Sequence, residues 1–226
     1  MKQGLIKIGI SLVSVTALFI VCLASKPTVP TAQDPARVVL IDPGHGGADG
    51  GAVAFDGTME KDLNLSIALA LRAMLQTFGV PTQMTRDTDV SIHDPSAAGI
   101  KQQKVSDMHN RLRLYEQATL IVGIHQNYFS VEKYSGTQLF YGTAHSDSRR
   151  LAETVRQTVV SALQPNNTRE LKRGTDIYLL EHTTRPAIFV ECGFLSNREE
   201  CDRLQQESYQ HRMALTIAVG IVEYMK

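Results

Sequence analysis

The sequence has little cysteine, no tryptophan and no excess of charge of either sign. Three cysteines in 226 residues are too few for a disulfide-rich scaffold or a zinc ribbon. Lys and Arg together number 23, and so do Asp and Glu, so the basic surface that marks a nucleic-acid-binding protein is missing. The sequence has no low-complexity tract, and 43% of its residues are hydrophobic, which excludes a disordered chain. Length and composition predict one globular domain, or one domain with a tail.

Residues 1–25 have the pattern of an export segment. Two lysines precede a largely apolar stretch over 8–24, and a polar, Pro-rich sequence follows. The length of this stretch lies between the apolar core of a signal peptide and a membrane-spanning helix, so cleavage and retention both remain open. We predict a signal peptide or membrane anchor over 1–25, a linker over 26–36 and an exported domain over 37–226. Removing the two lysines from the 23 basic residues leaves 21 against 23 acidic ones, so the rest of the chain is slightly acidic.

Strand-like and helix-like segments alternate along the domain. Short runs rich in β-branched residues predict strands at 37–42, 80–85, 120–125, 137–141 and 187–191. Apolar residues at helical spacing predict helices at 62–78 and 209–224. A run of Arg and Leu predicts a helix at 107–117, and a further helix is expected at 149–163. We also expect a loop over 87–105, an extended piece at 177–180 and a capping box that opens a short helix at Ser196. The alternation predicts a single α/β domain with a mainly parallel or mixed twisted sheet flanked by helices.

Three of the predicted strands end in a residue that binds metals or moves protons. The first strand runs into a Gly-rich loop that contains His45, the third ends at His125, and the last ends at Glu191. In open α/β sheets the carboxyl ends of the strands form the ligand crevice. We therefore expect His45, His125 and Glu191 to converge on one site at this edge of the sheet.

Two imidazoles and one carboxylate form a ligand set of catalytic zinc, which keeps a fourth position for water. The third ligand must be an acid near the Gly-rich loop or at the start of a helix. The residues alone leave four candidates: Asp42, Asp49, Glu60 and Asp62. Glu60 is favoured because it lies at the mouth of the predicted 62–78 helix, where a rigid element can hold its carboxylate toward the loop. An acid is also favourable at a helix N-terminus without any metal.

Five short blocks occur in order along the domain. They are DPGHGGADGGA at 42–52, EKDLNL at 60–65, MTRDTD at 84–89, IHQN at 124–127 and VECGFLSN at 190–197. Together they resemble the blocks of the zinc-dependent N-acetylmuramoyl-L-alanine amidases of the bacterial cell wall, the amidase type 3 family, over residues 37–224. Carried over residue by residue, the resemblance implies Zn²⁺ as cofactor, with His45, Glu60 and His125 as metal ligands and Glu191 as the catalytic carboxylate.

Within this family the chain is most similar to the subgroup that acts in spore cortex formation and germination. The single-domain build, the N-terminal export segment, the insertion at 87–115 and SGTQLFYG at 135–142 carry that similarity. The resemblance implies that the enzyme hydrolyses the amide between N-acetylmuramic acid and L-alanine in peptidoglycan. It also implies a role in muramic-δ-lactam formation.

The same resemblance implies certain partners and a location. They are a lipoprotein activator, a separate muramic acid deacetylase in the same pathway, and a place outside the cytoplasmic membrane, in the cell wall or the forespore intermembrane space. Membrane contact is expected through the N-terminal segment alone, and no nucleic acid is expected as a partner. Two other functions stay open at this point: a different zinc peptidase acting on wall peptides, and a non-catalytic wall-binding or regulatory protein.

The chain departs from the family pattern at Gly123, where Ser is common, and at Cys192, where an aliphatic residue is frequent. Adjacent residues of a strand point to opposite faces, so Cys192 should face the core if Glu191 faces the site. We expect Asp42 to fix the His45 loop or to accept a hydrogen bond from the His45 imidazole. For four further polar residues, holding substrate and holding the loops remain equal alternatives: Asn64, Arg86, Arg111 and Asn127.

Overall fold

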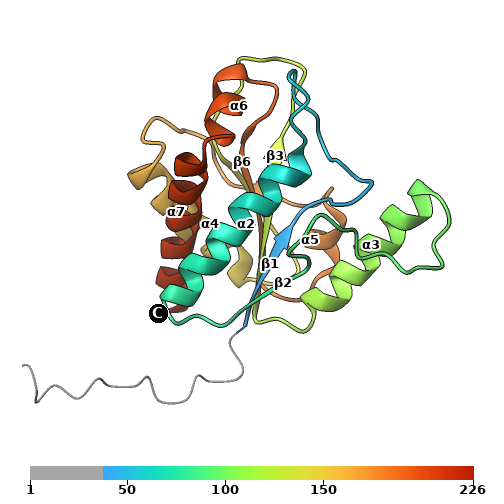
Figure 1. Cartoon of the computed structure of the whole chain (residues 1–226). Helices are drawn as coiled ribbons and strands as arrows, with labels where there is room; N and C mark the ends of the chain where they lie inside the picture. The colour runs from blue at the N-terminus through green and yellow to red at the C-terminus, as the bar shows by residue number, and fades with distance from the viewer. Residues whose placement is uncertain (1–37) are drawn as a thin grey trace, which may run out of the picture. The chain divides into compact units, whose positions relative to one another are not determined.

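A six-stranded mixed sheet runs through the described part of the chain, residues 38–226 of a computed structural model (Figure 1). The strands are β1 (Val39–Pro43), β2 (Thr82–Met84), β3 (Leu120–Asn127), β4 (Gln138–Tyr141), β5 (Lys172–Arg173) and β6 (Ala187–Phe194), in the spatial order β2-β1-β3-β6-β4-β5. Neighbours from β2 to β6 pair in parallel, and β4 pairs antiparallel with β6. The predicted α/β fold with a mixed sheet is confirmed. The predicted export segment and linker, residues 1–36, lie outside the described residues.

Helices cover both faces of this sheet. They are α2 (Glu60–Thr77), α3 (Ile100–Tyr115), α4 (Asp147–Ala162), α5 (Tyr178–His182), α6 (Arg198–Leu204) and α7 (Glu207–Met225). The larger apolar core lies between the sheet and α2, α4 and α7, and a smaller one lies between the sheet and α3 and α5 (Figure 1). Alternation along β3 sends Val122 and Ile124 into the larger core and Ile121 into the smaller one.

Helix α2 illustrates how the sequence builds this arrangement. Leu63, Ile67, Leu71 and Leu75 recur every four residues and are all buried, so they form one apolar face against the sheet and α7. Two acidic residues occupy the first turn, where their negative charges interact favourably with the helix macrodipole. The helix is therefore anchored along its length, and its first residue, Glu60, is held firmly at the carboxyl edge of β1 and β3.

Three local predictions were wrong. The predicted loop over 87–105 ends early, because α3 begins at Ile100. The part of α3 that was not predicted as helix, residues 100–106, contains no buried residue, so it lacks the apolar periodicity that would indicate a longer helix. The segment at 177–180 is not extended, since α5 begins at Tyr178. The short helix α6 is capped by Asn197, whose side chain accepts from the Glu200 amide, and not by Ser196.

The two cysteines of the domain are buried free thiols within residues 38–226. Cys192 lies in the larger core, on the face of β6 opposite to the candidate site, as the alternation of the strand predicts. Among the described residues, no helix combines the length and the apolar character that crossing a membrane requires.

Candidate metal centre

Side chains from three separate segments meet at the carboxyl edge of the sheet. His45, Glu60 and His125 each offer a ligand atom, and these atoms all lie within 4.8 Å of one another. His45 Nε2 is 3.2 Å from Glu60 Oε2, and His125 Nδ1 is 3.1 Å from Glu60 Oε1. Donor atoms around a tetrahedral zinc ion with bonds of about 2.0–2.1 Å are about 3.3 Å apart, and each imidazole nitrogen lies close to that distance from one of the two Glu60 oxygens. Two imidazole nitrogens and one carboxylate oxygen also suit zinc chemically.

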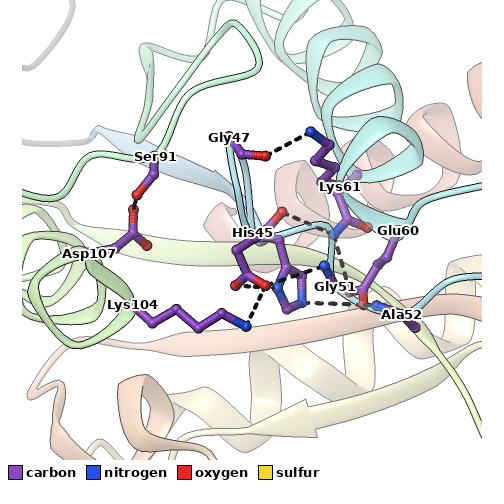
Figure 2. A network of polar contacts seen from close by, with 12 residues as sticks. His45, Gly47, Gly51, Ala52, Glu60, Lys61, Ser91, Lys104 and Asp107 are labelled. Atoms are coloured by element: carbon purple, nitrogen blue, oxygen red, sulfur yellow. Dashed lines mark hydrogen bonds and ion pairs between the residues drawn. The ribbon is translucent and has the colours of Figure 1, made fainter. Parts of the chain in front are cut away.

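The loop after β1 holds His45 in an unusual conformation. The φ angle of His45 is 62°, a region that residues other than glycine rarely adopt. Arg111 Nη2 donates to the His45 carbonyl at 2.7 Å, and Asp49 Oδ2 lies 2.9 Å from His45 Nδ1. The Lys104 side chain extends toward His45 (Figure 2), and its Nζ lies 2.7 Å from the other Asp49 oxygen. Because Asp49 engages Nδ1, the His45 ring presents Nε2 to Glu60, and a carboxylate in this position fixes the tautomer of a metal-binding imidazole.

The charges of the site favour a cation at its centre. Burial opposes a charged imidazole, but the carboxylates of Asp49 and Glu60 outweigh burial and raise the pKa of His45 to about 9. Burial also opposes ionisation of Glu60, yet the imidazoles of His125 and His45 hold the pKa of its carboxyl well below the usual range. A proton on His45 Nε2 and a metal ion would both lie between His45 and Glu60, so we expect metal binding to displace that proton.

Glu60 is held by backbone and side-chain donors on both of its oxygens. The Ala52 amide donates to Oε2 at 2.9 Å, while the Gln126 amide and Asn64 Nδ2 donate to Oε1 at 3.1 and 3.2 Å. As the first residue of α2, Glu60 also has a fixed backbone. Its carboxylate is therefore preorganised between the two imidazoles.

The His125 ring fits a narrow slot. The Phe189 ring stacks on it with centroids 4.6 Å apart and an interplanar angle of 17°. A Cβ atom at Gly44 would lie 2.0 Å from His125 Cε1, and one at Gly123 would lie 2.5 Å from the Phe189 ring. Gly44 is thus required for the approach of His125, and Gly123, the departure from the family pattern, makes the room that Phe189 occupies.

Glu191 pairs with His125 across the β3–β6 ladder, just before a shift of register in that ladder. Burial raises the pKa of the Glu191 carboxyl to about 7, against the opposing charge of His125. Its Oε2 atom is buried and has no hydrogen-bond partner among the described residues. A carboxylate with a near-neutral pKa and an unused oxygen beside the ligand cluster is suited to accept and return a proton.

Asp42 lies in a buried polar cluster beneath the His45 loop and does not bond with the His45 imidazole. Asp42 is fully buried and accepts hydrogen bonds from Arg111, Thr85 and Tyr115. Burial opposes its ionisation, but Arg111 and the two hydroxyls hold the pKa of Asp42 below its usual value. Asp42 does not contact the His45 imidazole, whose partner is Asp49. It fixes the loop indirectly, because Arg111 also donates to the His45 carbonyl.

Three of the four further polar residues hold the loops, and one of them is Arg111, which donates to the His45 carbonyl. Arg86 is buried and donates to the carbonyls of Pro43 and Gly44, and to that of Lys61 at the start of α2. Asn64 donates to the Gly44 carbonyl as well as to Glu60.

Sequence reasoning missed the roles of Asp49 and Phe189. The available signals were the spacing of four residues between His45 and Asp49 and the position of Phe189 two residues before Glu191 on the same strand face.

An α/β domain with two imidazoles and a carboxylate at the carboxyl edge of its sheet has the arrangement of a metal-dependent hydrolase. The chain belongs to the N-acetylmuramoyl-L-alanine amidase family, whose model matches residues 39–223. The germination-specific N-acetylmuramoyl-L-alanine amidase of Bacillus subtilis is 35% identical over 190 residues, which cover 83% of this chain and 79% of that protein.

Solved structures agree with this assignment. The structure of the CwlD amidase from Clostridioides difficile in complex with the GerS lipoprotein has a TM-score of 0.80 and 36% identity, over 84% of this chain and 98% of the other. The N-acetylmuramoyl-L-alanine amidase AmiC2 of Nostoc punctiforme has a TM-score of 0.71 and 32% identity, over 84% and 97% of the two chains. Fold and sequence thus identify the same family.

Proposed function

We propose that this chain is a zinc-dependent peptidoglycan amidase in which His45, Glu60 and His125 hold the metal and Glu191 is the general base and acid. The scissile bond is the amide between the lactyl carboxyl of N-acetylmuramic acid and L-alanine. The observation that carries the proposal is the convergence of three ligand atoms within 4.8 Å, beside a carboxylate whose buried oxygen has no hydrogen-bond partner within residues 38–226.

The chain's own residues divide the work of the reaction. Zinc, when bound, polarises the substrate carbonyl and lowers the pKa of a bound water. Asp49 holds His45 with Nε2 toward the centre, and the donors on Glu60 keep its carboxylate in place. Glu191 accepts a proton from the attacking water and returns it to the leaving amine nitrogen. Its pKa near 7 lets one group do both near neutral pH, because neither protonation state is strongly disfavoured.

We place the enzyme in formation of the spore cortex, outside the cytoplasmic membrane. Its similarity to a germination-specific amidase and to CwlD supports this role. The relative in complex with GerS suggests that this chain also has a lipoprotein activator. Conversion of the product to a muramic-δ-lactam would require a separate muramic acid deacetylase. Residues 1–25 would export or anchor the chain, residues 26–36 would link that segment to the domain, and residues 37–226 would form the catalytic domain.

Digestion of purified peptidoglycan tests the reaction. The full chain, with and without added zinc, is incubated with the wall, and the released ends are identified by mass spectrometry. We expect new L-alanine amino ends that appear in the presence of zinc and disappear after chelation. New ends within the stem peptide would indicate a peptidase instead. Zinc binding without any new ends would indicate a non-catalytic wall-binding protein.

A further inference from the structure

A cavity of about 230 Å³ lies beside the candidate metal centre, between the His45 loop, α3 and α5. His45 and His125 form one side of it. Its apolar wall consists of Ile100, Met108, Ile177, Leu179 and Phe189. An apolar cavity of about 150 Å³ accommodates benzene, so this one has room for a group of at least that size.

The charged groups on the cavity wall are already paired. Lys104 and Asp49 form an ion pair at 2.7 Å, and Arg111 bonds with Asp107 at 2.6 Å and with Asp42. An occupant therefore finds no free charge in the wall among these groups, and the free energy of binding must come from apolar contact. The cavity suits an uncharged, largely apolar group.

Glu191 does not line the cavity, although both imidazoles do. In the proposed reaction Glu191 returns a proton to the leaving amine, so the amine half of the substrate must lie within hydrogen-bond reach of Glu191. The acyl half then extends from the metal in another direction. The cavity is a space that His45 and His125 border and Glu191 does not, so it is open to the acyl half.

We infer that this cavity binds the acyl half of the substrate and takes its methyl-bearing groups, the lactyl methyl and the acetamido methyl of the muramoyl unit. This inference rests on the proposed function. Helix α3 supplies Met108 and Ile100 to the wall and α5 supplies Leu179, so these residues determine which acyl groups the enzyme accepts.

A pair of hydroxamates tests the cavity without turnover. Acetohydroxamate and benzohydroxamate share a metal-binding head and differ in the size of the acyl group. Binding to the zinc-loaded full chain is measured by isothermal titration calorimetry. Burying the phenyl ring should make benzohydroxamate bind about 10- to 100-fold more tightly than acetohydroxamate.

Met108→Trp fills the cavity and should remove this preference, because the phenyl ring of benzohydroxamate then has no space. Met108→Phe should remove part of the preference and serves if the larger ring is not accommodated. Val105→Trp is the matched control, because Val105 lies on the same helix but is exposed and does not line the cavity; it should keep the full preference.

Equal affinities of the wild type for the two hydroxamates would overturn the inference. Persistence of the preference in both Met108 variants would overturn it too. If neither hydroxamate binds the zinc-treated chain, the metal centre itself is contradicted and the inference falls with it. Binding of both with no size preference leaves the metal centre standing and refutes the cavity alone.

Discussion

Replacing Arg111 with Met removes the centre of the buried cluster under the His45 loop. The Arg111 side chain is 3% exposed and that of its partner Asp42 is 1% exposed. Arg111 also bonds with Asp107 and donates to the carbonyls of Pro43 and His45. The variant therefore leaves a buried carboxylate without its counter-charge and frees the strained loop at one contact.

Breaking a buried ion pair by removing one partner costs about 3–5 kcal/mol. A domain is stable by about 5–15 kcal/mol, so this loss is a large fraction of the total. The loss should shrink as the pH falls toward about 4. Without Arg111, burial raises the pKa of Asp42. The variant therefore loses most stability when Asp42 is ionised, and protonation of Asp42 reduces that loss.

Urea denaturation of the metal-free protein at several pH values measures this effect. Arg113→Met is the matched control, because Arg113 is exposed on the same helix, and its stability should stay within about 0.5 kcal/mol of the wild type. A loss of stability below about 1 kcal/mol in Arg111→Met near pH 7, or a loss that grows as the pH falls, would contradict this role of Arg111.

Three further variants follow from the site. Gly123→Ser should lower the free energy of unfolding by about 1–3 kcal/mol and weaken zinc binding, since the new Cβ would lie 2.5 Å from the Phe189 ring that stacks on His125. Phe189→Leu in the same chain should restore zinc affinity, and a zinc titration that shows no such rescue would contradict this steric explanation. Asp49→Ala should lower zinc affinity by about 10- to 100-fold with little change in fold, as competition with a chelator would show; an unchanged affinity would remove Asp49 from its positioning role. Glu191→Gln should make the metal-free protein more stable than the wild type above about pH 8, by at most about 3 kcal/mol. The reason is that ionising a carboxyl whose pKa is raised to about 7 in the folded state destabilises the folded state. Near pH 4, below the folded and unfolded pKa values, thermal unfolding should show no difference between the two proteins, and a difference that persists there would argue against this cause.

Much of the fold could be predicted because apolar patterns are local. The strands around Ile41, Val122 and Val190 and the helix around Ile67 show their period directly in the sequence. The first turns of helix α3 do not, because its two buried residues, Arg111 and Tyr115, both lie in its second half. Arg111 bonds with Asp42, 69 residues away in the sequence. Pairing over such a distance leaves no periodic signal.

The candidate site, too, could be predicted from the sequence only in part. The ends of the strands already indicated His45, His125 and Glu191, because the carboxyl ends of neighbouring parallel strands share an edge. Glu60 could be separated from the other acids only through the family resemblance, since several acids lie near the loop. The stacking of Phe189 on His125 depends on the side-chain room at Gly123, a three-dimensional fit that spacing in the sequence does not reveal.

In the proposed mechanism a zinc ion at His45, Glu60 and His125 acts together with Glu191 to hydrolyse the muramoyl amide. Turnover per bound zinc, measured on peptidoglycan for the wild type and for Glu191→Gln, is the most direct test of this mechanism. We predict equal zinc content in the two proteins and turnover at least about 100-fold lower in the variant. Full turnover in a zinc-loaded Glu191→Gln protein would contradict it.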